Sequence, residues 1–148
     1  MNAEPPARVF VDTNVLVYAH DYTAGEKHRR AKALLEQLWE AGNGCLSIQV
    51  LQEFYVTVTQ KIRRPLAQTL ARQLVADLGH WQVHAPAVED VLDAITLQET
   101  AGLSFWDAMI VQSAVRLGCR QLLSENLNAG QAYAGVRVSN PFAPTPSA

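Results

Sequence analysis

Cysteine and net charge are both scarce in this chain of 148 residues, which has two cysteines and a formal net charge of −2. Two cysteines cannot form a disulfide framework, and Cys45 and Cys119 match no metal-ligand spacing. We therefore expect both to be small core residues in a reducing compartment. The weak charge provides no bulk attraction to a nucleic acid or a membrane, so binding to a polyanion would need a local basic patch or a metal ion.

The chain also lacks long apolar runs, internal repeats and low-complexity segments. Residues 1–6 show no basic region followed by an apolar run, and charges interrupt the later apolar stretches well short of a membrane span. We therefore expect a cytoplasmic protein without a membrane segment. The apolar fraction of 49% suits a single domain over residues 1–148. Its regular elements are expected within about residues 8–139, because both ends are polar and contain proline.

Short apolar runs alternate with longer segments of helical periodicity along the sequence. Strands are expected at residues 8–11, 45–47, 81–84, 121–123 and 136–138. Helices are expected at residues 14–20, 26–41, 50–64, 66–78, 87–100 and 104–117. Because strands that alternate with helices pair in parallel through right-handed crossovers, the pattern predicts an α/β fold. We expect a three-layer α/β/α sandwich around a central, mostly parallel sheet of about five strands.

Three isolated carboxylates, those of Asp12, Glu53 and Asp107, stand within otherwise apolar stretches. Burying such a group is expensive in free energy unless a partner or a metal ion compensates its charge. Asp12 follows the first expected strand and Asn126 follows the fourth, so both lie at the edge where parallel sheets collect their ligands. Glu53 and Asp107 lie about one turn into helices whose N-termini point at the same crevice. We therefore expect these side chains to converge on a divalent cation.

Four segments, in this order, resemble the PIN-domain nucleases over nearly the whole chain: Val-Asp-Thr-Asn-Val-Leu at 11–16, Gln-Glu-Phe at 52–54, Ser-Phe-Trp-Asp-Ala at 104–108 and Leu-Ser-Glu-Asn-Leu-Asn at 123–128. Together with residues 130–131 and 140–142, they resemble most the VapC-type toxins, the ribonucleases of type II toxin–antitoxin modules. The resemblance implies an endoribonuclease that hydrolyses RNA phosphodiester bonds with Mg²⁺ or Mn²⁺. It also implies a homodimer, and a cognate antitoxin that places a basic side chain near the carboxylates.

In such a site Asp12 is the central metal ligand, Asp107 is a second direct ligand, and Glu53 binds the ion or orients water. The fourth ligand position departs from the family, which commonly has an acidic residue where this chain has Asn126. An amide oxygen can ligate a metal ion but brings no charge, so we expect one tightly held ion and a weaker second one. Glu125 is a candidate substitute for the missing charge. The residues expected to support the ligands are Asn14, Ser104, Ser124 and Glu125.

Simpler structural roles remain open for several of these residues. Asp12 and Ser104 each stand where they can cap a helix, and Glu53 can lie on a helix surface. Trp106, like the other two tryptophans, is most simply a core or interface anchor. A non-catalytic PIN-like module that binds RNA or an antitoxin also remains open, because Asn126 weakens the acidic site.

Basic residues precede the expected helix end near Pro65, and we expect Arg63 and Arg64 to contact RNA or a partner. An acidic metal site needs nearby cations to hold a polyanionic substrate, and single-stranded RNA is bound by such grooves with aromatic stacking. Two rival classes fit less well. A phosphatase with an aspartyl nucleophile normally has a second carboxylate at the position of Asn14, and a phosphoacceptor signalling domain has a lysine after a late strand, where residues 123–126 offer none.

Overall fold

One sheet of six strands lies at the centre of the structure, a computed structural model that describes residues 4–144. Its spatial order is β3-β2-β1-β4-β6-β5. The strands are β1 (Val9–Val11), β2 (Gly44–Ser47), β3 (Gln82–His84), β4 (Gln121–Leu123), β5 (Ala132–Tyr133) and β6 (Val136–Ser139). All neighbouring strands are parallel except β5, which pairs antiparallel with β6.

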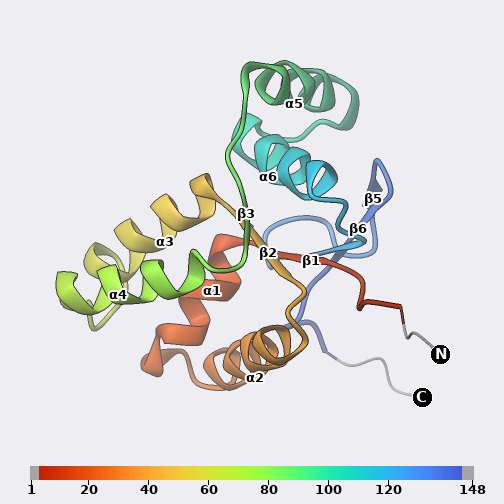
Figure 1. Cartoon of the computed structure of the whole chain (residues 1–148). Coiled ribbons are helices and arrows are strands. Elements are labelled where there is room, and N and C mark those ends of the chain that lie inside the picture. The colour runs from red at the N-terminus through yellow and green to blue at the C-terminus, as the bar shows by residue number, and fades with distance from the viewer. Residues whose placement is uncertain (1–3, 145–148) are drawn as a thin grey trace.

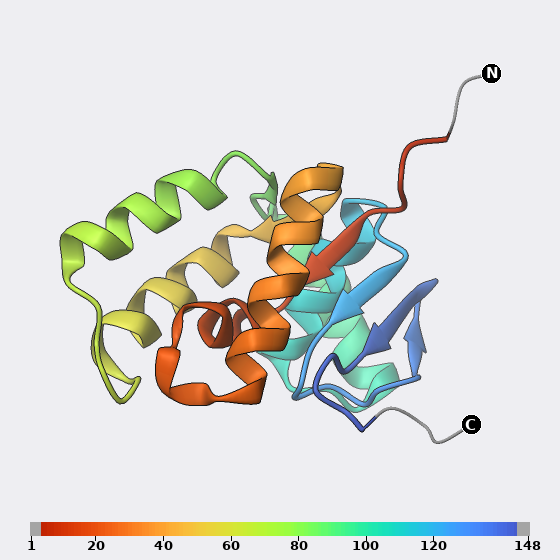
Figure 2. The same ribbon diagram turned by 90° about the horizontal axis from the view of Figure 1, so that it is seen from below.

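Helices cover both faces of this sheet. They are α1 (Thr13–His20), a short 3₁₀ helix (Tyr22–Ala24), α2 (Glu26–Ala41), α3 (Ile48–Gln60), α4 (Gln68–Leu78), α5 (Val88–Ala101) and α6 (Phe105–Arg116). Figure 1 shows α5 and α6 on one side of the sheet and α1 and α2 on the other, while α3 and α4 pack against each other and project from it. The view from below in Figure 2 shows the same projection of α3 and α4. Within residues 4–144, no helix is both long enough and apolar enough to cross a membrane.

The predicted three-layer arrangement with a mostly parallel sheet is confirmed. All five expected strands are present, and their ends agree to within about one residue. The sixth strand, β5, is missing from the prediction because two residues are too short to show an alternating pattern. Helix α4 begins at Gln68 rather than at residue 66, because Ala67 has an extended backbone. The expectations for residues 1–3 and 145–148 lie outside the described residues.

Apolar side chains from the sheet and its helices form one large core. Phe10, Leu46 and Leu122 belong to three adjacent strands, and Leu16 and Phe54 belong to the helices that follow β1 and β2; all five are fully buried. The two cysteines are buried as expected: Cys45 has no exposed surface and Cys119 is 5% exposed.

The two edges of the sheet have opposite character. At the carboxyl edge, the Asp12 N–H donates to the Leu123 carbonyl at 2.9 Å, which brings the polar residues after β1 and β4 together. At the amino edge, Gly44 lies so close to Trp81 that an added Cβ would stand 2.5 Å from the indole ring. The amino edge therefore carries a close aromatic contact, whereas the polar residues gather at the carboxyl edge.

Candidate active site

Asp12 is the first residue after β1 and the N-cap of α1, and it is 6% exposed. Its Oδ1 atom accepts the Thr13 N–H at 2.7 Å, and its Oδ2 atom accepts the Ser124 hydroxyl at 2.8 Å and the Asn14 amide at 3.3 Å. The helix-capping role left open by the sequence is therefore present. It uses only part of the carboxylate, because each oxygen has two lone pairs and Oδ1 accepts one hydrogen bond from the described residues.

Asn14 and Ser124 fasten the loop after β4 to the start of α1. The buried Ser124 hydroxyl donates to Asp12 and accepts the Asn126 N–H at 3.1 Å. The Asn14 side-chain oxygen accepts the Glu125 N–H at 3.0 Å. Both residues therefore contact or frame Asp12, as the sequence leads us to expect, and they fix the direction of its carboxylate.

Negative charges surround Asp12. Burial, together with the charges of Glu53 and Asp107, raises the pKa of Asp12 to about 6, against the opposing hydrogen bonds from Ser124 and Thr13. The three carboxylates also line a common groove, although they come from the start of α1, from α3 and from α6. Within residues 4–144, none of the three forms a salt bridge. The structure therefore brings the three predicted residues to one groove, and their convergence on a metal ion stays a prediction.

The expectation that all three carboxylates are buried is wrong, because only Asp12 is. Glu53 is exposed and Asp107 is half-buried. In α3 the helical period directs Leu51 and Phe54 into the core and leaves Glu53 on the open side, so apolar neighbours in sequence do not bury it. The Glu53 side chain is instead held by Gln49, whose amide donates to Oε1 at 2.8 Å.

Ser104 is the N-cap of α6, and its hydroxyl accepts the Asp107 N–H at 3.2 Å. The capping role considered from the sequence is therefore observed. Ser104 supports Asp107 through the backbone of the first helical turn rather than through the carboxylate itself.

Asn126 lines the groove with the three carboxylates, whereas Glu125 points elsewhere. The Glu125 carboxylate accepts the Tyr18 hydroxyl at 2.9 Å and forms a salt bridge with Lys27 at 2.6 Å. Glu125 therefore contributes its N–H to the site, through Asn14, and its charge is paired outside the groove. The idea that it replaces the acidic residue missing at Asn126 has no support in this arrangement.

The donors in the groove fit a hard divalent cation in kind, because they are oxygen ligands with an uncompensated negative charge. Within residues 4–144, no side chain donates a hydrogen bond to the Asp107 carboxylate, so its oxygens are free to bind an ion. As the side chains stand, however, no group of three His, Cys, Asp or Glu residues in the described part of the chain is close enough to hold a metal.

The groove has a volume of about 470 Å³ and also contains cationic and aromatic side chains. Lys61 and Arg63 at the end of α3 line it, and so does Trp106, which precedes Asp107 in α6. Arg64 does not belong to this lining, so the predicted pair of RNA-contacting arginines is divided. Trp106 is 65% exposed, so of the two predicted roles, core or interface anchor, the core role is wrong.

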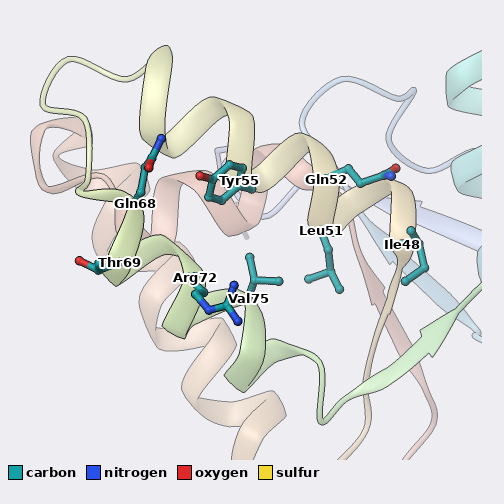
Figure 3. A pocket seen from close by; sticks show the side chains of 8 residues that line it. All are labelled: Ile48, Leu51, Gln52, Tyr55, Gln68, Thr69, Arg72 and Val75. Atoms are coloured by element: carbon teal, nitrogen blue, oxygen red, sulfur yellow. The ribbon is translucent and has the colours of Figure 1, made fainter.

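A larger cavity, of about 640 Å³, lies between α3 and α4. Figure 3 shows that both helices contribute its lining, with Leu51, Tyr55 and Val75 among its side chains. It contains no carboxylate, and Arg72 is its one charged lining residue among those described. The cavity therefore lacks the groups for hydrolysis, and the carboxylate groove remains the candidate active site.

A second buried carboxylate, Asp90, lies at the start of α5 and is 1% exposed. It accepts the Ala87 N–H at 2.8 Å and the Gln112 amide at 3.1 Å, and it faces His84 and Arg116 at 3.2 Å each. Although burial alone would raise its pKa, these hydrogen bonds and the charges of His84 and Arg116 lower the pKa of Asp90 below its ordinary value. This carboxylate is compensated within the protein.

Gln49 and Trp106 are among the groove residues that were not predicted to belong to the site, as are Tyr18, Asp21 and Lys61. The signal for Gln49 is its position four residues before Glu53, which places both side chains on one face of α3. For Trp106 the signal is weaker, because an aromatic residue in an apolar segment is usually buried. Their link becomes visible only in the structure, where the Gln49 amide also donates to the Trp106 carbonyl at 3.3 Å.

Residues 9–133, which include the three carboxylates and Asn126, match the sequence model of the PIN domain. The chain belongs to the PIN domain family. Comparison with curated proteins gives no significant sequence match. The family membership therefore rests on the match over most of the chain, and it agrees with the order of the four segments in the sequence.

Solved structures share the fold of this PIN domain. A toxin–antitoxin complex from Klebsiella pneumoniae aligns with a TM-score of 0.67 and 19% identity, covering 90% of this chain and 98% of that one. VapBC2 from Rickettsia felis, bound to a DNA fragment from its promoter, aligns with a TM-score of 0.60 and 18% identity, covering 89% and 97%. VapC20 of Mycobacterium tuberculosis, a sarcin–ricin loop cleaving toxin, aligns with a TM-score of 0.58 and 17% identity. The alignment covers 77% of this chain and 86% of that one.

Proposed function

We propose that this PIN domain is a metal-dependent endoribonuclease that hydrolyses RNA phosphodiester bonds. The observation that carries the proposal is the convergence of Asp12, Glu53 and Asp107 on one groove without a cationic partner among the described residues. The pKa of Asp12 is raised first by burial and then by two like charges, and such a carboxylate is costly to keep ionised unless a cation binds it. Membership of the PIN family and similarity in fold to a toxin that cleaves RNA support the same activity.

Mg²⁺ or Mn²⁺ is the proposed cofactor, with Asp12 and Asp107 as direct ligands and Glu53 and Asn126 completing the set. A bound divalent cation would activate water and neutralise charge on the phosphate. Ser124 and Asn14 hold the Asp12 carboxylate in place for this role, and Gln49 holds Glu53 beside it. Lys61 and Arg63 supply positive charge at the groove for the RNA backbone.

The proposed biological role is that of the toxin of a toxin–antitoxin pair, acting in the cytoplasm as a homodimer. Two of the similar structures are toxin–antitoxin assemblies, which supports an antitoxin partner for this chain. Three carboxylates that form no salt bridge among the described residues suit an antitoxin that inserts a basic side chain, since this would compensate the same charges as a metal ion.

The direct test is cleavage of a structured RNA pool by the purified, antitoxin-free protein with Mg²⁺ or Mn²⁺, against EDTA and an Asp12→Ala variant. We expect metal-dependent cleavage that Asp12→Ala abolishes. Cleavage that persists in EDTA would contradict the metal-dependent mechanism. Absence of cleavage by folded protein would contradict the nuclease.

A second candidate function follows from the uncharged Asn126, which lines the groove where the family commonly has an acid. In this alternative the protein is a catalytically weakened module that binds RNA or an antitoxin. Calorimetric titration with Mn²⁺ separates the cases: we expect one tight site in the wild-type protein and a second site strengthened in Asn126→Asp. RNA binding without turnover, with turnover restored by Asn126→Asp, would favour the weakened module.

A further inference from the structure

Trp106 is unusual in this molecule because a large aromatic side chain is left 65% exposed beside a buried site. The residues that follow it in α6, Ala108, Met109 and Ile110, are all buried, so the segment offers an apolar core that the indole does not enter. An exposed large apolar side chain calls for an explanation when it stands at a functional groove.

The indole is held in position even though it is exposed. The Phe105 ring packs edge to face against it, with the ring centroids 5.1 Å apart. The Trp106 carbonyl accepts the Gln49 amide, the same amide that holds Glu53. The first turn of α6, with Ser104 as its N-cap, fixes the backbone on both sides. A side chain anchored in this way loses little freedom when it binds a partner.

The Trp106 side chain lies in the groove where the proposed reaction takes place, not on a distant surface. Trp106 directly precedes Asp107, and both line the groove with Asp12. Lys61 and Arg63 line the same groove from the end of α3. An aromatic ring that lies beside a proposed metal-binding carboxylate and beside cations resembles a nucleotide-binding site. In such a site the cations bind the phosphate and the ring stacks on the base.

We propose that the Trp106 indole is the stacking platform for an unpaired base next to the cleaved phosphate. The proposal rests on the ribonuclease function given above and assigns Trp106 as a substrate-positioning residue for it. Bases in an A-form duplex are stacked on each other, so a protein ring can reach their faces only where they are unpaired. Stacking also tolerates sequence, because every base has a π-face.

The test uses the full chain and a short unpaired RNA whose cleaved bond has been mapped, together with versions that carry an abasic nucleotide on either side of that bond. We expect Trp106→Ala to raise KM by about 10- to 100-fold with a much smaller change in kcat, and Trp106→Phe to recover most of this. One abasic substrate should raise the wild-type KM similarly, yet add little in Trp106→Ala. A duplex of the same sequence should be the poorer substrate for the wild-type protein.

Tyr22→Ala is the matched control, because Tyr22 is 80% exposed and lies outside the groove lining. It should leave KM unchanged for every substrate. An unchanged KM in Trp106→Ala, or an abasic penalty that is equally large in wild type and Trp106→Ala, would overturn the inference and assign the indole to a protein contact.

Binding measurements separate this inference from the proposed function. If the wild-type protein cleaves no RNA, Kd replaces KM, and it is measured with the wild-type and Trp106→Ala proteins on a short unpaired RNA and on versions with one abasic nucleotide at each position in turn. The pattern expected above would then support stacking although the nuclease proposal fails. Kd values that do not respond to Trp106→Ala would overturn the stacking as well.

Discussion

Asp12 and Asp90 are both buried carboxylates in the first residues of a helix, but they have opposite surroundings. Asp90 accepts two hydrogen bonds and faces an arginine and a histidine, and the pKa of its carboxyl is lowered. Asp12 accepts three hydrogen bonds, yet its charged neighbours are Glu53 and Asp107, and its pKa is raised to about 6.

The difference fits a structural role for Asp90 and the proposed functional role for Asp12. The charge of Asp90 is balanced within the chain by His84 of β3 and Arg116 of α6, so that Asp90 links the start of α5 to both elements. Asp12 forms no salt bridge among the described residues, which suits the proposed metal ion. Burial alone would not have distinguished them, since the two residues are 6% and 1% exposed.

The largest expected effect comes from exchanging each carboxylate for its amide. Asp12→Asn should lower kcat/KM for RNA cleavage by at least about 10³-fold, because the central metal ligand loses its charge. Asp90→Asn should leave kcat/KM within about threefold when assayed below its unfolding transition, a limit set by the small cost of a distant change. Equal losses of activity in the two variants would remove the distinction between them.

Removing the whole carboxyl group of Asp90, instead of exchanging it for an amide, should lower the stability of the fold. Asp90→Ala leaves His84, Gln112 and Arg116 without their common acceptor, and we expect a loss of about 3 kcal/mol in the free energy of unfolding, measured in urea. Glu89→Ala is the control, because Glu89 lies exposed in the same helical turn. It should change the free energy by less than about 0.5 kcal/mol. A loss no larger than that of the control would show that the charges around Asp90 do not stabilise the fold.

Asp12 and Asp90 should also contribute to the stability of the folded protein with opposite dependences on pH. Asp12 has a pKa of about 6 in the folded protein and an ordinary value of 3.8, so the folded state binds the proton more tightly. Stability from this group therefore falls as pH rises from about 4 to 7, by an order of 2 kcal/mol in EDTA. Asp90, with a lowered pKa, contributes stability above its ordinary value that is lost as the solution is acidified through its folded pKa.

Comparing wild type with Asp12→Asn isolates the first of these two dependences. The variant should be the more stable protein at pH 7 without metal, and the two melting temperatures should converge toward pH 4. Saturating Mn²⁺ should stabilise the wild type alone. A difference between the two proteins that does not depend on pH would contradict the raised pKa.

The smallest effect on function is expected from substituting the arginines that follow α3. Arg63 lines the groove and Arg64 does not, so Arg63→Ala should weaken RNA binding a few-fold and reduce the slope of log Kd against log salt by about 0.7. Arg64→Ala is the matched control and should leave both unchanged. Identical effects of the two substitutions would indicate a diffuse electrostatic contribution instead of a contact in the groove.

Much of the fold could be predicted, because alternating strands and helices constrain topology strongly. The convergence of Asp12, Glu53 and Asp107 followed from the position of each after a strand or in an early part of the next helix. The prediction that Glu53 is buried was wrong because it relied on the apolar neighbours in sequence. The helical period of α3 turns those neighbours inward and Glu53 outward.

Asp90 could not be recognised in the sequence. Its local segment resembles an ordinary acidic first turn of a helix, and its partners Gln112 and Arg116 come from a helix more than twenty residues away along the chain. Trp106 was missed for a related reason, since the side of α6 that faces the groove depends on the packing of the whole helix.

The tryptophans of this protein are divided between the two edges of the sheet. Trp39 and Trp81 pack edge to face, with centroids 5.3 Å apart, at the amino edge, whereas Trp106 packs against Phe105 and lines the groove. The molecule therefore carries two intrinsic optical probes in separate environments. Emission from the pair would report on unfolding, and quenching of Trp106, obtained by difference with Trp106→Phe, would report on occupancy of the groove without any attached label.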